Sequence, residues 1–188
     1  ANPNVNGPPL NLDYGYLVQF FPTLILPGVY VMNDAEASNL VTYANSGYFG
    51  ILSTDGGIAM KNEAGAFDLG RVESTFGVAP SINVISNISQ FKITITNQHY
   101  VTVDYLPGTT ISATGTANAY SGIAGSGKDL GLVTNGGSTR PAAIVNFTGP
   151  DTNAPCKTVV FNFPADTQGQ LTNTFSKITR RAFEWIRG

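Results

Sequence analysis

The amino-acid sequence predicts a mainly β domain, an antiparallel sandwich or barrel with an extended N-terminal arm and one C-terminal amphipathic helix. Charged residues make up only 12% of the 188 residues. The polar residues are mainly Asn, Thr and Gly, which suit strands and turns. Short apolar runs rich in Val, Ile, Phe and Tyr alternate with turn signals such as Pro27-Gly28 and Pro107-Gly108. Only the C-terminal segment has the periodicity of a helix.

Residues 1–13 form the predicted arm. Their prolines remove backbone donors and hold the chain extended, so the segment suits neither a helix nor a central strand. We expect the arm to run along another subunit instead of folding onto its own domain, in the manner of strand addition. The arm residues expected to make this contact are Pro3, Val5, Pro8, Pro9, Leu10 and Leu12.

Residues 14–164 form the predicted β body. Runs of β-branched and aromatic residues bounded by Gly, Pro and Asn predict its strands. Outside the hairpin described next, we expect strands at 15–21, 29–32, 48–52, 82–85, 110–117, 142–147 and 158–163.

One hairpin is predicted in detail between residues 91 and 105. Apolar residues alternate with polar ones on both sides of Asn97-Gln98-His99. A three-residue loop places all the apolar side chains on one face, whereas a two-residue loop splits them between faces. The predicted pairs are Ile95 with Val101, Ile93 with Val103, and Phe91 with Tyr105.

Residues 165–188 contain the predicted helix. Thr167 and Gln170 have the spacing of a capping box. An apolar stripe follows, which we expect to pack on the body or on a neighbour; its members are Leu171, Phe175, Ile178, Ala182 and Ile186. The positive charges of the C-terminal half complement the helix dipole. We expect Arg180, Arg181 and Trp185 to make contacts, either with a partner or, for Trp185, with the body.

A glycine-rich segment resembles a phosphate-binding loop. Residues 122–128, GIAGSGK, match that loop up to its lysine. The next residue is Asp129, where Mg²⁺ requires a Ser or Thr hydroxyl, and LGLVTNGG does not continue as a helix. We therefore interpret the segment as a loop and expect no nucleotide cofactor.

Catalytic constellations are scarce. His99 is the only histidine and Cys156 the only cysteine. A nucleophile–histidine scheme must use His99, which we expect to be exposed in the hairpin loop. Cys156 is expected to be a buried, inert thiol. Hydrolysis by two carboxylates stays open, because five acidic residues have no spacing that fixes their separation: Asp55, Glu63, Asp68, Glu73 and Asp104. We expect no catalytic residue, no metal site and no cofactor.

Charge and hydropathy limit the partners. A formal net charge of -2 does not favour nucleic acid as the main partner, and no small-molecule substrate is expected. The longest apolar stretch, residues 16–26, is too short to cross a bilayer. The first residue, Ala1, fits removal of an initiator Met as well as cleavage of a leader, so the compartment stays open.

The extended Pro/Asn arm, the Thr/Gly/Asn-rich β body, the low charge and the terminal helix together resemble virion structural proteins of tailed bacteriophages. The resemblance covers the chain loosely and fixes no residue. It implies a non-enzymatic subunit of the tail tube, baseplate or capsid decoration that assembles with itself and with other virion proteins. An extracellular adhesin or carbohydrate-binding module is the alternative, and a two-carboxylate hydrolase is a third.

Overall fold

The computed structural model describes residues 23–27, 33–45, 50–54, 73–78, 90–114, 122–123, 127–135, 138–148, 156–161 and 173–188. The α-helices within them are α2 (Asp34–Ala44) and α3 (Asn173–Arg187), and the 3₁₀ helices are η1 (Glu73–Phe76) and η2 (Tyr100–Thr102). The strands are β1 (Thr23–Pro27), β2 (Gly50–Thr54), β3 (Gln90–Ile95), β4 (Thr110–Thr114), β5 (Lys128–Asn135), β6 (Ser138–Thr148) and β7 (Cys156–Phe161).

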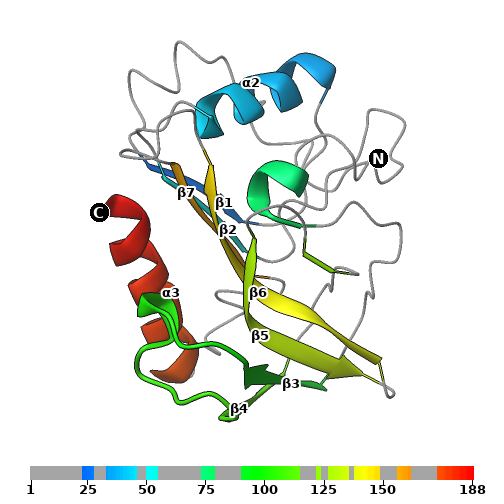
Figure 1. Ribbon diagram of the computed structural model, residues 1–188, viewed down its shortest axis with the longest axis vertical. Helices are drawn as coiled ribbons and strands as arrows, with labels where there is room; N and C mark the ends of the chain where they lie inside the picture. Colours follow the sequence, from blue (N-terminus) through cyan, green and yellow to red (C-terminus); the bar gives the residue numbers. More distant parts are fainter. Residues whose placement is uncertain are drawn as a thin grey trace.

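The described strands form one mixed sheet in the order β1-β2-β7-β6-β5-β3-β4. The first three strands are parallel, and the others pair antiparallel. Helix α2 connects β1 to β2, which is the crossover that a parallel pair needs. The prediction of a mainly β sandwich or barrel is therefore wrong, and the chain has a mixed α/β fold (Figure 1).

Helix α2 was not predicted from the sequence. It begins with a capping box, in which the Asn33 side chain accepts from the backbone N–H of Glu36 and the Glu36 carboxylate accepts from that of Asn33, both at 2.9 Å. Its apolar stripe of Ala37, Leu40 and Tyr43 is buried. Placed between two parallel strands, this helix makes the first part of the domain a β-α-β unit.

The main core lies between one face of the sheet and α3 (Figure 1). Alternate residues of β2 and β7, Leu52, Val159 and Phe161, share one buried cluster with Ile178 and with other residues of α3. The cluster continues across the antiparallel strands and includes Ile93, Ile95, Val101, Ile111, Leu130 and Val145. The C-terminal helix thus closes the core of the whole sheet.

Close approach of backbones holds α3 against β2. A Cβ added to Gly50 would lie 2.5 Å from the carbonyl oxygen of Ile186 and 2.7 Å from its Cβ. Only glycine therefore fits at the start of β2 while the last turn of α3 keeps its place.

The opposite face of the parallel strands is also buried. It carries Leu26, Ile51 and Val160, and β7 contacts both α2 and η1. Two hydroxyls on this face, Ser53 Oγ and Thr158 Oγ1, are fully buried and lack a hydrogen-bond partner. Burial raises the pKa of Tyr43 far above its ordinary value, and the neighbouring Cys156 raises it further.

The predicted hairpin between residues 91 and 105 is wrong. Strand β3 pairs with β4 and β5, so Ile93 lies opposite Ile111 and Val133 instead of Val103. The alternation is confirmed on β3, where Ile93 and Ile95 are buried. It fails after His99, because residues 100–102 form η2 and a turn with Gly108 at φ +88° follows.

Other predicted elements are present with shifted bounds. Strands near 48–52, 110–117, 142–147 and 158–163 are confirmed as β2, β4, β6 and β7, and the C-terminal helix as α3. The expected strands at 15–21, 29–32 and 82–85 lie outside the described residues, as do the arm, residues 1–13, and Leu171. Strands β1 and β5 were missed. Lys128 opens β5, which confirms that the residues after this lysine do not continue as a helix.

Candidate functional site

The segment that contains η2 is held by a reciprocal cap. His99 is extended, and its ring Nδ1 accepts the backbone N–H of Val101 at 3.2 Å. The backbone N–H of His99 donates to Thr102 Oγ1 at 3.1 Å, and that hydroxyl donates to the carbonyl of Asn97 at 2.9 Å. Val101 and Thr102 are buried. The expectation of an exposed turn histidine is wrong, because His99 is a half-buried capping residue.

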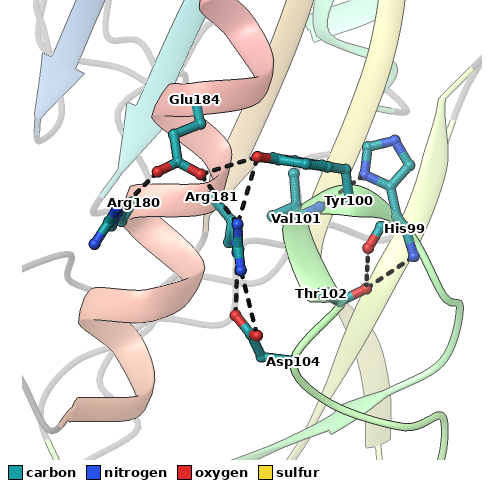
Figure 2. A network of polar contacts seen from close by, with 8 residues as sticks. All are labelled: His99, Tyr100, Val101, Thr102, Asp104, Arg180, Arg181 and Glu184. Atoms are coloured by element: carbon teal, nitrogen blue, oxygen red, sulfur yellow. Dashed lines mark hydrogen bonds and ion pairs between the residues drawn. The ribbon is translucent and has the colours of Figure 1, made fainter.

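Arg181 of α3 joins the helix to this segment (Figure 2). Its Nε donates to Asp104 Oδ2 at 3.2 Å, and its second and third nitrogens reach Asp104 Oδ1, Tyr100 Oη and Glu184 Oε2. Tyr100 Oη donates to Glu184 Oε2 at 3.0 Å, while Arg180 Nε donates to Glu184 Oε1 at 2.8 Å. One network therefore links residues about eighty positions apart.

The network sets the charge states of its members. Hydrogen bonds from Arg180 and Tyr100 lower the pKa of the Glu184 carboxyl. Hydrogen bonds to Asp104 and Tyr100 raise the pKa of Arg181 beyond its already high value. Arg181 and Glu184 thus stay charged across the ordinary pH range. The formal charges of the two arginines and the two carboxylates of the network sum to zero.

Trp185 packs inside the domain. The rings of Trp185 and His99 meet edge to face, with centroids 4.8 Å apart. Lys157 Nζ lies 5.5 Å from the Trp185 ring centre and donates to the Trp185 carbonyl at 3.1 Å. An ammonium at this place caps the last turn of α3 and is attracted to the negative end of the helix dipole. Contact of Trp185 with the body is confirmed.

Beside the network, three large apolar side chains face solvent. Tyr100 is 45% exposed, Val103 46% and Leu106 70%. They are spaced by three residues, and the bonds Thr102 N to His99 O and Val103 N to Tyr100 O are those of a 3₁₀ turn. Helix α3, which contacts this segment through Arg181, also carries basic side chains that face solvent: the Arg180 side chain is 80% exposed and Lys177 is exposed. We call Tyr100, Val103, Leu106, Lys177 and Arg180 the η2–α3 surface.

The structure brings Arg180 and Arg181 together around Glu184, whereas Trp185 packs on His99 and Lys157. Tyr100, Val103 and Glu184 were missed as site residues, and Asp104 was considered only as a possible acid of a hydrolase. The six arm residues, Pro3, Val5, Pro8, Pro9, Leu10 and Leu12, lie outside the described residues, so their docking role stays a prediction.

The described residues bring together few groups for catalysis. The Nδ1 of His99 is occupied by Val101, and Cys156 is confirmed as buried. Of the five acidic residues considered for hydrolysis, Asp104 is bound to Arg181. Asp55, Glu63 and Asp68 lie outside the described residues, and the side chain of Glu73 is not described. Across the described ranges, no group of three His, Cys, Asp or Glu side chains is arranged to hold a metal ion. No helix in these ranges is both long and apolar enough to cross a membrane.

Comparison with known proteins shows the fold alone. No family model matches the sequence, and no curated protein matches it. The mmIFT52 N-terminal domain is similar in structure, with a TM-score of 0.62 and 13% identity over 93% of this chain and 80% of that one. The cytoplasmic protein STM3548 from Salmonella typhimurium has a TM-score of 0.58 and 10% identity over 97% of this chain and 76% of that one.

These similarities agree with the mixed sheet and correct the expected fold class. One part of the likeness to tailed-bacteriophage virion proteins was a β body, and the domain is instead mixed α/β, like the mmIFT52 N-terminal domain. Neither similar structure is named as a virion protein. The assignment to a tail, baseplate or capsid component is therefore withdrawn.

Proposed function

We propose that this chain is a non-enzymatic protein-binding domain whose η2–α3 surface docks an acidic segment of another protein that carries an apolar anchor. The observation that carries the proposal is the exposure of Tyr100, Val103 and Leu106 on a segment whose backbone is fixed by hydrogen bonds. Aromatic and arginine side chains are enriched at the centres of protein interfaces.

Pre-organisation supports a binding role. The Tyr100 ring is held by hydrogen bonds to Glu184 and Arg181, and the Arg181 guanidinium lies 5.4 Å from that ring. A side chain already fixed in the free domain loses little entropy when a partner covers it. The network therefore lowers the cost of docking on Tyr100.

Charge favours an acidic partner. Helix α3 carries Lys177, Arg180, Arg181 and Arg187 against Glu184 and against Asp104, which is paired with Arg181, so the helix and its partner carboxylate have a net charge of +2. The whole chain has -2, so the remaining residues sum to -4. Positive charge is thus gathered on the helix that borders the exposed apolar side chains, and an acidic segment is attracted there.

Nucleic acid fits this surface less well than protein. Arg180 and Arg181 are each bonded to a carboxylate, Glu184 or Asp104, so few cations remain to neutralise a row of phosphates, whereas a peptide with an apolar anchor depends less on charge. Leu106 and Val103 offer a base no hydrogen bond, whereas they suit the apolar side chain of a peptide.

Fluorescence anisotropy tests the proposal with labelled peptides of alternating Glu and Leu, and with Lys-Leu peptides of the same length as the charge control. We expect the Glu-Leu peptide to bind, with an affinity that falls as salt is added. Leu106→Thr and Arg180→Gln should each weaken binding about tenfold. Ile25→Thr is the matched control, because Ile25 is an exposed isoleucine on β1, at the other end of the sheet from η2.

Three results would count against the proposal. The first is equal binding of the Glu-Leu and Lys-Leu peptides, and the second is a loss of binding in Ile25→Thr as large as that in Leu106→Thr. The third result is tighter binding of an oligo-dT strand or of phosphatidylserine vesicles than of any peptide, with the same sensitivity to Arg180→Gln.

A further inference from the structure

We propose that His99 is a pH-sensitive latch: its protonation releases η2 and disassembles the η2–α3 surface, so the domain binds near neutral pH and releases in mild acid. This inference rests on the proposed function for the identity of the site, and it adds the regulation of that site. The geometry of the ring nitrogen carries it.

The cap requires a neutral imidazole. His99 Nδ1 accepts the N–H of Val101 at 3.2 Å, and an imidazole nitrogen can accept only while it carries no proton. After protonation, both ring nitrogens are donors, and Nδ1–H would face the donor N–H of Val101. One of the two bonds of the cap is then replaced by a repulsion, and Val101 is a buried member of the core.

The groups around His99 offer little compensation for a new positive charge. Lys128 of β5 acts on the ring as a like charge, and Lys157 of β7 already places an ammonium on the Trp185 ring that His99 contacts. Burial and then Lys128 lower the pKa of His99.

The acidic groups of the neighbouring elements are already engaged by other residues. Asp129 Oδ2 accepts from Thr96 at 2.7 Å, and Asp104 and Glu184 bind Arg181. A protonated His99 therefore finds no free carboxylate among the described residues around it.

Loss of the cap is transmitted to the exposed surface through η2. Tyr100 directly follows His99, and its hydroxyl bonds Arg181 and Glu184. Val103 closes the 3₁₀ turn with its N–H on the Tyr100 carbonyl at 3.4 Å. A displaced η2 therefore moves Tyr100 and Val103 together and breaks the link to α3.

The sign of the pH dependence follows from the lowered pKa. The unfolded or released segment binds a proton at the ordinary value of 6.5, and the capped segment binds it only at lower pH. The cap is thus fully stabilising above pH 6.5 and is progressively lost as the pH falls from there through the lower pKa of the capped state. Because the chain has one histidine, no second imidazole contributes to this window.

The free domain provides the first test, without any peptide. The one tryptophan, Trp185, touches the one histidine, so its fluorescence should report the titration of His99 between about pH 7.5 and 5. We expect the protection of the Val101 amide against hydrogen exchange, corrected for the intrinsic pH dependence of exchange, to fall about tenfold over the same range. His99→Asn keeps a capping acceptor that does not titrate, and should abolish both changes. His99→Phe keeps a ring against Trp185 without an acceptor, and the Val101 amide should be weakly protected at every pH.

The second test uses the Glu-Leu peptide with the wild type and with His99→Asn. The wild type should bind about tenfold more weakly at about pH 5 than at about pH 7.5, whereas His99→Asn should change less than about twofold. The Glu side chains of the Glu-Leu peptide also titrate in this range, and the comparison with His99→Asn corrects for their contribution. Equal loss in both proteins overturns the latch.

The two proposals fail in distinguishable ways. If Val101 exchange follows the titration of His99 but no peptide binds, the proposed function is wrong and the latch stands. If peptide binds but the protection of the Val101 amide is the same at both pH values, or if His99→Asn retains the full pH dependence, the latch is wrong and the docking surface stands.

Discussion

Gly50 is the place where the backbones of β2 and α3 come closest in the described structure, and Gly50→Ala perturbs that contact alone. The added Cβ would lie 2.7 Å from Ile186 Cβ and 2.5 Å from the Ile186 carbonyl oxygen. Two carbon atoms pack best at about 3.5–4.0 Å, so the last turn of α3 would have to move by about 1 Å. The clash involves the Ile186 carbonyl, so a smaller side chain at position 186 does not relieve it.

The expected cost follows from two opposing terms. Overpacking of a dense core costs about 1–3 kcal/mol. Replacing glycine restricts the unfolded chain and returns about 0.4–1 kcal/mol, since Gly50 does not occupy the left-handed region. The free energy of unfolding of the variant should therefore be about 1–2 kcal/mol lower, and its Tm should fall by roughly 2–8 °C.

Urea and thermal unfolding followed by circular dichroism measure this loss, with Ser53→Ala as the matched control. The control puts the same alanine into the same strand, where it removes a fully buried hydroxyl that lacks a hydrogen-bond partner. Such a hydroxyl costs about 1–3 kcal/mol to bury, and its removal leaves only a small cavity, so the control should be unchanged or up to about 1 kcal/mol more stable. Wild-type stability for Gly50→Ala, or a larger loss for Ser53→Ala, would refute the reasoning.

Four further outcomes are expected. Ile178→Ala should lower the free energy of unfolding by about 2–5 kcal/mol, because Ile178 is buried against the sheet; a loss under about 1 kcal/mol in urea unfolding would show that α3 is not part of the core. Thr158→Val should be neutral or slightly stabilising by the same measurement, since Thr158 Oγ1 lacks a partner. Lys157→Met should speed exchange of the last amides of α3 by NMR, because the cap on the Trp185 carbonyl is removed, and unchanged exchange would contradict that role. Burial raises the pKa of Tyr43, so the contribution of this residue to the stability of the fold is complete below pH 10 and is lost as the pH rises further. Tyr43→Phe should therefore flatten the alkaline limb of the curve of stability against pH.

The sequence contained a signal for α2 that composition obscured. Asn33 and Glu36 have capping-box spacing, and Ala37, Leu40 and Tyr43 follow at helical intervals. The low content of charged helix formers favoured strands throughout the chain, yet burial against the sheet, more than propensity, stabilises a helix of this kind.

Parallel pairing was harder to foresee than the strands themselves. Strand β7 is buried at Cys156 and from Thr158 through Phe161, which is typical of a strand covered on both faces. Its neighbour in the sheet, β2, lies about one hundred residues earlier in the chain. Nothing local in either strand encodes that partner.

The site was predicted in part. The positive charge of α3 indicated Arg180 and Arg181, but the Arg181 partners Asp104 and Tyr100 come from a segment whose alternation, VTVDY, imitates a strand. The cap at His99 and the turn at Gly108 override that pattern and expose Val103. Hydrogen bonds, which the residue types alone do not reveal, therefore decide between a strand and a turn in this segment.

Closure of the core by α3 has a consequence for synthesis of the chain. Leu52 leaves the ribosome roughly 130 residues before Ile186, which at about 5–20 residues per second is an interval of roughly 7–26 seconds. Throughout that interval Leu52 lacks the helix that covers it, and Val159 and Phe161 join it only near the end. The nascent domain therefore completes its core only after translation of α3.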